Sequence, residues 1–126
     1  MTNSIAGVFR PLLLTVGPSD SLEAAAGLMV DHHVGALAVW DGELEGMLSE
    51  RDLARAMAAG AAPARTRVVD YMTPRPYVVS PEDACEEVAR LMVEEGIRHA
   101  PVVAANAVVG MISVRDLLAW SLGQTA

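Results

Sequence analysis

The chain has no lysine. Its nine basic side chains are all arginines, set against 16 aspartates and glutamates, so the formal net charge is −7. Sequence-independent nucleic-acid binding depends on neutralising many phosphates, and an acidic chain without a basic run is a poor candidate for it. Aromatic residues, at 4%, are also too few for a base-stacking surface. Arginine can still hold a small phosphorylated ligand, because its planar guanidinium pairs bidentately with phosphate.

Cysteine and long apolar runs are scarce as well. The single Cys85 excludes an internal disulfide, and its place in a helical apolar pattern predicts a buried structural thiol. No apolar run approaches the ~18 residues that a membrane span needs. Residues 1–4 carry neither a basic flank nor a long apolar stretch, so we expect no signal peptide and a cytoplasmic protein.

Sequence motifs typical of enzymes are missing too. The chain contains no phosphate-binding loop, no dinucleotide-binding glycine pattern and no nucleophile-elbow pattern. We therefore expect no enzymatic activity and no catalytic residues.

An internal repeat covers nearly all of the 126 residues. Its period is 63 residues and becomes 64 near the end of the repeat, so that Phe9-Arg10-Pro11 matches Met72-Thr73-Pro74. The seven residues Gly46–Asp52 match Gly110–Asp116: both read glycine, an apolar pair, serine, a variable residue, arginine and aspartate. We expect a first repeat at residues 5–60, a linker at 61–67 and a second repeat at 68–123.

Each repeat has the pattern of an extended piece, a helix, two short strands and a final helix. This predicts an α+β fold of two β-α-β-β-α repeats. One half alone would bury only about 60% of its surface, so we expect the halves to pack face to face about a pseudo-two-fold axis. The expected extended pieces are Leu13–Val16 and Tyr77–Val79; the first helices begin at Asp20 or Ser21 and at Ser80–Pro81; the strands are 36–40, 44–48, 100–104 and 107–112; the final helices begin at Ser49 and Ser113.

These features resemble the cystathionine-β-synthase (CBS) domain pair, also called a Bateman module. The resemblance is carried by the two glycine-to-aspartate motifs, by the lead-in Val69–Pro74 and by Ile97–Val103. It spans essentially the whole chain, which therefore resembles a stand-alone pair.

The resemblance implies a regulatory, energy-sensing module that binds an adenosine nucleotide (AMP, ADP or ATP, with S-adenosylmethionine less favoured) in clefts between the two repeats. It also implies a homodimer, acting on a protein partner that the sequence does not identify. No obligatory cofactor, metal, nucleic acid or membrane is expected.

By the same resemblance, Asp52 and Asp116 would bind ribose hydroxyls, which suits an acceptor-only carboxylate. Ser49 and Ser113, at helix starts, would face phosphate, and Arg51 and Arg115 would neutralise it. The second repeat carries Arg98-His99 where the first has Gly35-Ala36, so we expect the Asp116 cleft to bind more tightly. The predicted stronger cleft comprises Asp116, Ser113, Arg115, Arg98, His99, Val16, Gly35 and Ala36; the weaker one comprises Asp52, Ser49, Arg51, Val79, Ser80 and Ala100.

Simpler interpretations remain open for the same residues. Serine followed three residues later by aspartate is also a capping box, and the two motif arginines could form exposed ion pairs of little energy, ~0–1 kcal/mol. His32-His33 is best explained as a pair of surface histidines, because adjacent helical residues point apart. Trp120 fits either the core or a dimer contact. The alternative function is a ligand-free dimerisation or interaction scaffold on the same fold.

Overall fold

The structure is a computed structural model that describes residues 3–11 and 15–123. The chain divides into two compact units. The central unit is Leu14–Pro76, and the terminal unit combines Met1–Leu13 with Tyr77–Ala126. The first expected extended piece falls partly on Leu13 and Leu14, which lie outside the described residues; Val16 itself forms a parallel bridge with Val39.

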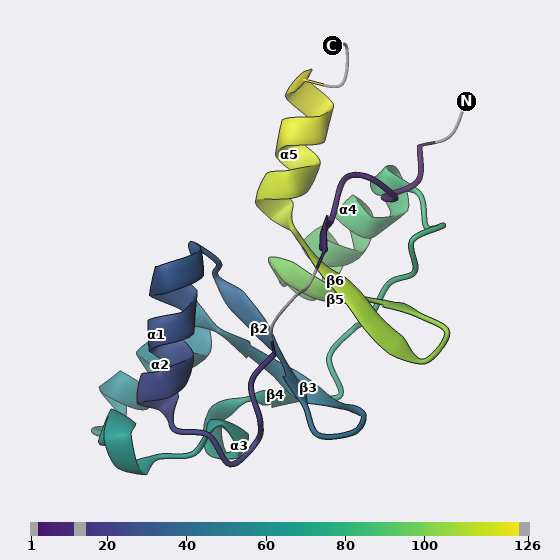
Figure 1. Ribbon diagram of the computed structural model, residues 1–126. Coiled ribbons are helices and arrows are strands. Elements are labelled where there is room, and N and C mark those ends of the chain that lie inside the picture. Colours follow the sequence, from purple (N-terminus) through teal and green to yellow (C-terminus); the bar gives the residue numbers. More distant parts are fainter. Residues whose placement is uncertain (1–2, 12–14, 124–126) are drawn as a thin grey trace. The chain divides into compact units, whose positions relative to one another are not determined.

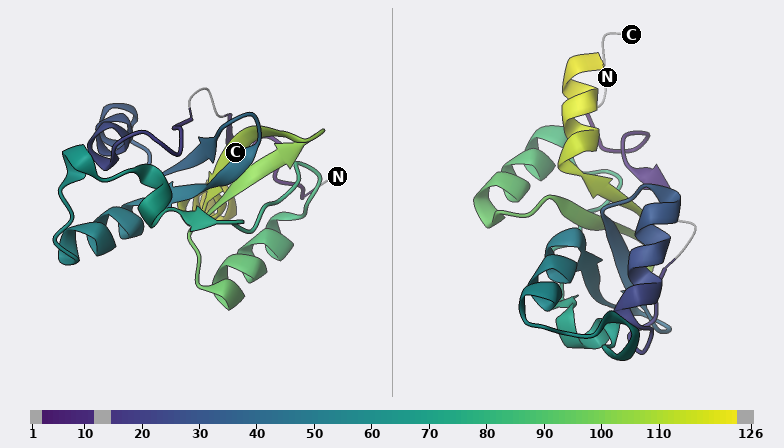
Figure 2. Two further views of the ribbon diagram at one scale, coloured as in Figure 1. Left: turned by 90° about the horizontal axis from the view of Figure 1, so that it is seen from below. Right: turned by 90° about the vertical axis from the view of Figure 1, so that its left-hand side faces the viewer.

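The central unit is a three-stranded antiparallel sheet with helices along one side (Figures 1 and 2). Strand order is β2-β3-β4. Apolar side chains of α1, α2 and α3 pack with Leu37, Val39 and Leu48 of the sheet into one core. The elements are α1 (Leu22–His32), β2 (Ala36–Trp40), β3 (Leu44–Ser49), α2 (Glu50–Ala58), a 3₁₀ turn (Pro63–Arg65), α3 (Val68–Tyr71) and β4 (Thr73–Pro74).

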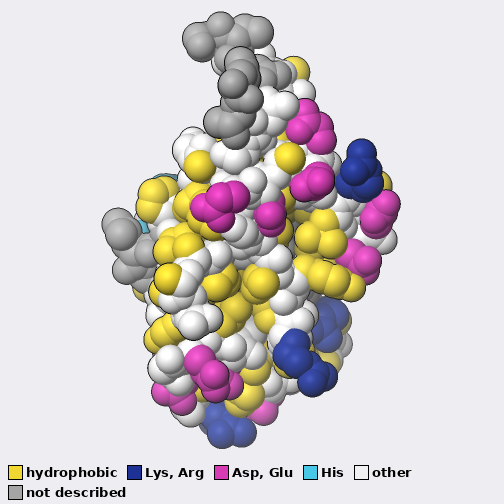
Figure 3. Space-filling view, turned by 90° about the vertical axis from the view of Figure 1, so that its right-hand side faces the viewer, with side chains coloured by type: hydrophobic (Ala, Val, Ile, Leu, Met, Phe, Trp, Pro, Cys, Tyr) yellow, Lys and Arg dark blue, Asp and Glu magenta, His cyan; other side chains and the backbone are white. Residues whose placement is uncertain are grey.

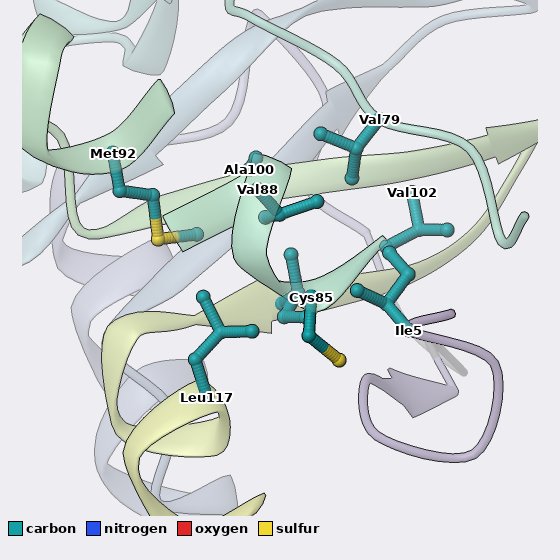
Figure 4. Close-up of a cluster of buried hydrophobic side chains, with 9 residues drawn as sticks. Ile5, Val79, Cys85, Val88, Met92, Ala100, Val102 and Leu117 are labelled. Carbon is teal, nitrogen blue, oxygen red and sulfur yellow. The ribbon is translucent and has the colours of Figure 1, made fainter. Parts of the chain in front are cut away.

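The terminal unit repeats this plan with a sheet of order β1-β6-β5. Its buried cluster joins α4 and α5 to the sheet (Figure 4). Cys85 belongs to that cluster and has no exposed surface, which confirms the predicted buried thiol. Burial raises the pKa of the thiol. The elements are β1 (Arg10–Pro11), α4 (Cys85–Glu95), β5 (His99–Ala104), β6 (Ala107–Ser113) and α5 (Val114–Gly123).

Two equivalent segments, Asn3–Pro11 and Thr66–Pro74, are called the lead-in segments below; the second includes the lead-in Val69–Pro74 named above. Each segment opens one repeat in the sequence but packs in the unit formed by the rest of the other repeat. Thus β1 pairs with β6, and β4 pairs with β3. Each unit therefore contains residues of both sequence repeats.

Equivalent backbone hydrogen bonds hold the two lead-in segments. The N–H of Cys85 donates to the Asn3 carbonyl (2.7 Å), as that of Leu22 does to the Thr66 carbonyl (2.9 Å). Both acceptors are the first residues of their segments, 63 positions apart. In the core, the corresponding pair is Ile5 and Val68, both fully buried.

The start of the second repeat's first helix differs from expectation. It was expected at Ser80–Pro81, but α4 begins at Cys85 with Ala84 as N-cap, so that prediction is wrong. The Ser80 N–H instead donates to the Asp83 carboxylate (2.8 Å), which forms a turn before the helix. The first N–H group of α4 is satisfied by the lead-in segment rather than by a capping side chain. In the first repeat Ser21 is the N-cap, one of the two residues expected.

The glycines of the repeated motif lie directly under the lead-in strands. A Cβ at Gly46 would sit 2.7 Å from the Thr73 carbonyl oxygen, and one at Gly110 would clash with the Phe9 ring and the Arg10 carbonyl oxygen. Backbone atoms of a paired strand cannot move aside cheaply. Glycine is therefore required at both positions for the lead-in strand to approach.

We predict that Gly46→Ala and Gly110→Ala each lower the free energy of unfolding by about 1–3 kcal/mol, the usual cost of overpacking. Urea denaturation measures this. Gly27→Ala is the matched control, because a Cβ there meets nothing within 4 Å and alanine favours its helix. Gly46→Ala and Gly110→Ala proteins as stable as the wild type would contradict this role for the glycines.

Candidate functional site

The start of α2 is a complete capping box. The Ser49 N–H and hydroxyl both donate to Asp52 Oδ2, at 2.8 and 3.1 Å, and the Asp52 N–H donates to Ser49 Oγ at 3.3 Å. This confirms the simpler interpretation of the motif in the first repeat. It also places an ionisable carboxylate in an almost fully covered position, because Asp52 is only 4% exposed.

The start of α5 has the same backbone pattern with a more accessible carboxylate. The Ser113 N–H donates to Asp116 Oδ2 (2.9 Å), and the Asp116 N–H donates to Ser113 Oγ (3.0 Å). Asp116 is half-buried rather than buried. Its Oδ1 has no hydrogen-bond partner in the described part of the chain.

Arg55 supplies one of the two hydrogen bonds by which Asp52 exceeds Asp116, and the Ser49 hydroxyl supplies the other. Its Nη2 donates to Asp52 Oδ1 at 2.9 Å and to the Tyr71 carbonyl oxygen at 3.1 Å. Asp52 therefore accepts bonds on both oxygens. Sequence reasoning missed this contact, although arginine three residues after aspartate on a predicted helix is a recognised pairing distance.

Five predicted site residues come together in the terminal unit. His99 pairs with Ser113 across β5 and β6, and the Val114 N–H donates to the Arg98 carbonyl oxygen (2.9 Å). Arg98 and His99 thus lie beside the start of α5, on the strand next to the one that delivers Asp116. Arg115 is exposed one position before Asp116.

The central unit holds the equivalent backbone positions without the basic pair. Ala36 pairs with Ser49, and the Glu50 N–H donates to the Gly35 carbonyl oxygen (3.0 Å). Arg51 is exposed. Neither Arg51 nor Arg115 has an ion-pair partner among residues 3–11 and 15–123, so the exposed-pair interpretation finds no support there.

Three further predicted cleft residues, Val16, Val79 and Ala100, lie in or beside the sheets. Val16 runs beside β2, and Val79 beside β5, each with its N–H and carbonyl bonded to that strand. Ser80 is half-buried in the turn that follows, and Ala100 is buried in β5. Each predicted cleft draws on both units, which the structure describes separately, so the clefts stay a prediction.

The remaining polar side chains matter for metal binding and for the exposed surface. The described residues hold no cluster of three histidine, cysteine or acidic side chains suited to a metal. His32 and His33 are exposed, as predicted for surface histidines. The hydrogen bond that Tyr77 donates to Glu95 (2.8 Å) raises the pKa of the tyrosine. Within the described segments no helix has the length and apolarity to cross a bilayer.

The family model of the CBS domain matches the chain twice, at residues 5–59 and 68–123. The chain belongs to the CBS domain family. The curated relatives include the CBS domain-containing protein YhcV of Bacillus subtilis, which is 33% identical over 116 residues, 91% of this chain and 83% of the relative. The resemblance noted in the sequence is thereby confirmed.

Solved structures of CBS domain proteins share the fold of the chain. The putative signal-transduction protein with CBS domains from Burkholderia ambifaria has a TM-score of 0.91 at 30% identity, covering 98% of this chain and 96% of that one. CBSX2 in complex with AMP has a TM-score of 0.80 at 28% identity and covers 98% of both chains. The hexameric CBS-CP12 protein from bloom-forming cyanobacteria has a TM-score of 0.87 at 31% identity, covering 94% of this chain and 71% of that one.

Proposed function

We propose that the chain is a regulatory module that binds an adenosine nucleotide, with Asp116 as the ribose-binding carboxylate. The observation that carries the proposal is the unpartnered Oδ1 of Asp116 within the described residues, on a half-buried side chain at a helix start. A carboxylate offers about four acceptor positions, and a vicinal diol needs two of them. Asp116 uses one for the Ser113 N–H and keeps the rest.

Charge around Asp116 favours a phosphorylated ligand over a bare nucleoside. Arg98 and Arg115 are both exposed, and both lie within or beside the β5–α5 corner that carries Asp116. The start of α5 adds a partial positive charge. The structural neighbour CBSX2, solved with AMP, supports the same ligand class.

Isothermal titration with AMP tests the proposal. We expect Asp116→Ala to raise the Kd by about tenfold or more, because two hydrogen bonds of about 0.5–1.5 kcal/mol each are lost. Asp52→Ala should change the Kd far less. A parallel thermal-shift screen of AMP, ADP, ATP and S-adenosylmethionine ranks the ligands, with ~2.7 kcal/mol of stabilisation expected at a hundredfold excess over Kd.

The control ligand is 2′-deoxy-AMP, which lacks one ribose hydroxyl. It should bind the wild type more weakly than AMP does, but it should bind Asp116→Ala with the same affinity as AMP. The protein must first be shown to be free of carried-over nucleotide by mass spectrometry. If none of the four compounds binds such protein, the nucleotide-sensor function is wrong. If Asp116→Ala binds AMP normally, the ribose-binding role of Asp116 is wrong.

A second function, self-association as a scaffold, is favoured by an apolar face on α4 and α5. Only Leu117 of α5 is buried, while Leu118 and Leu122 are 56% and 75% exposed, and Val93 of α4 is 82% exposed. A hollow of about 350 Å³ opens between the two helices. Trp120 borders it and also packs against the core, which is one of its two predicted roles; the dimer contact stays a prediction.

The surroundings of exposed apolar side chains also fit a protein contact. On the face shown in Figure 3, hydrophobic side chains lie among acidic ones, and the basic side chains lie mostly toward the right-hand margin and the bottom of the view. Apolar patches rimmed by polar residues are typical of protein interfaces. Homodimerisation through α4 and α5 is therefore the second part of the proposal, and it does not require a ligand.

We predict that Leu118→Glu converts a wild-type dimer to a monomer, because it places a charge on the apolar face. Light scattering coupled to gel filtration measures the mass. Met57→Glu is the control, since Met57 is 71% exposed on α2, outside this face. A monomeric wild type, or a dimer that survives Leu118→Glu unchanged, would count against this interface.

A further inference from the structure

The two motif carboxylates differ in how many hydrogen bonds they already accept. Asp52 accepts three: two on Oδ2 from Ser49 and one on Oδ1 from Arg55. Asp116 accepts one from the described residues. With about four acceptor positions each, Asp52 has one left and Asp116 has three. A ribose diol needs two, so the first repeat falls short by one.

Arg55 donates to Asp52 Oδ1, the oxygen whose counterpart in the second repeat, Asp116 Oδ1, is open among the described residues. Asp52 Oδ1 is bonded to its guanidinium, whereas Asp116 Oδ1 lies beside no such group in the described chain. The 64-residue offset that superposes Asp52 on Asp116 places Ala119 at the position of Arg55. Ala119 is exposed and has no donor in its side chain. The two repeats therefore contain a natural pair of variants at one position.

A second acceptor holds the Arg55 guanidinium in place. Its Nη2 also donates to the carbonyl oxygen of Tyr71, at the end of α3. Bonded to both α2 and α3, the guanidinium is fixed over a carboxylate whose side chain is only 6% exposed. A ribose that reached Asp52 would have to displace it and break both bonds.

We propose that Arg55 is an internal competitor that closes Asp52 to ribose, so that the chain has one working nucleoside site, at Asp116. The inference rests on the proposed nucleotide binding and adds the residue that decides which repeat takes part. Arg55 acts here as a specificity-determining residue of the first repeat. Ala119 leaves the corresponding position of the second repeat open.

The test uses adenosine as the titrant, because it carries the diol but no phosphate. Loss of a positive charge at position 55 then has no direct effect on the affinity. Isothermal titration gives the number of sites per chain for the wild type, Arg55→Ala and Ala119→Arg. Arg65→Ala is the control, since Arg65 is an exposed arginine of the same unit with no ion-pair partner in the described residues.

We expect one adenosine site per chain in the wild type and in the control Arg65→Ala, and two in Arg55→Ala. The added site should disappear in the double variant Arg55→Ala/Asp52→Ala. The reciprocal change, Ala119→Arg, should weaken the Asp116 site by about tenfold, as a charge-assisted hydrogen bond must now be broken.

Each other result has a definite meaning. One site in both the wild type and Arg55→Ala overturns the competitor role and leaves the proposed function standing. Two sites in the wild type also overturn it. No adenosine binding by the wild type or by Arg55→Ala overturns the competitor role, and the AMP titration described above then decides whether the proposed function falls with it. Should Arg55→Ala prove unfolded by circular dichroism, Ala119→Arg decides, because Ala119 is exposed: an unchanged affinity there rejects the inference.

Discussion

The rest of the structure depends on one constraint: the lead-in segment of each sequence repeat packs in the unit formed by the rest of the other repeat. We call this the exchange of lead-in segments. Asn3–Pro11 supplies a strand, a core residue and the first backbone acceptor for α4, and Thr66–Pro74 does the same for α1. Neither unit is complete with residues of one sequence repeat. The requirement for glycine in the repeated motif follows directly, because the exchanged strand passes over Gly46 and Gly110 at backbone contact.

The same constraint explains why two nearly identical motifs share a backbone framework although their carboxylates differ in hydrogen bonding. Pairing of the lead-in strand fixes β3 and β6, and each of these strands ends at a serine that caps the next helix. The cap holds the aspartate by one oxygen in both repeats. The oxygens differ in their further bonds: Asp52 also accepts from the Ser49 hydroxyl on Oδ2 and from Arg55 on Oδ1, whereas Oδ1 of Asp116 is open among the described residues. Duplication thus keeps the framework while the side chains around the carboxylate differ.

Much of this could be predicted from the sequence. The period-63 repeat, the valine-rich strands and the serine-to-aspartate spacing are local patterns, and β2, β3, β5, β6 and both capping serines are found where they were expected. The start of α4 was not predictable in this way, because its first N–H bonds to Asn3, 82 residues away in the chain. The exchange itself was not predictable, because each lead-in strand could pair with either β3 or β6, and these two strands have similar sequences. The hydrogen bond from Arg55 to the Tyr71 carbonyl was not predictable either, because it joins α2 to α3 and depends on how these helices pack.

The packing of each lead-in segment with the other repeat is tested most directly by amide hydrogen–deuterium exchange measured on two variants of the chain. Replacing a fully buried isoleucine by alanine lowers the free energy of unfolding by about 2–5 kcal/mol. Amides of the cooperative unit that contains the residue then lose their protection against hydrogen exchange. Ile5→Ala, in the first sequence repeat, should expose α4 and β6 while β2 and β3 stay protected. Val68→Ala, in the second repeat, should expose α1 and β3 while β5 and β6 stay protected. If each variant instead lost protection within its own sequence repeat, the exchanged architecture would be contradicted.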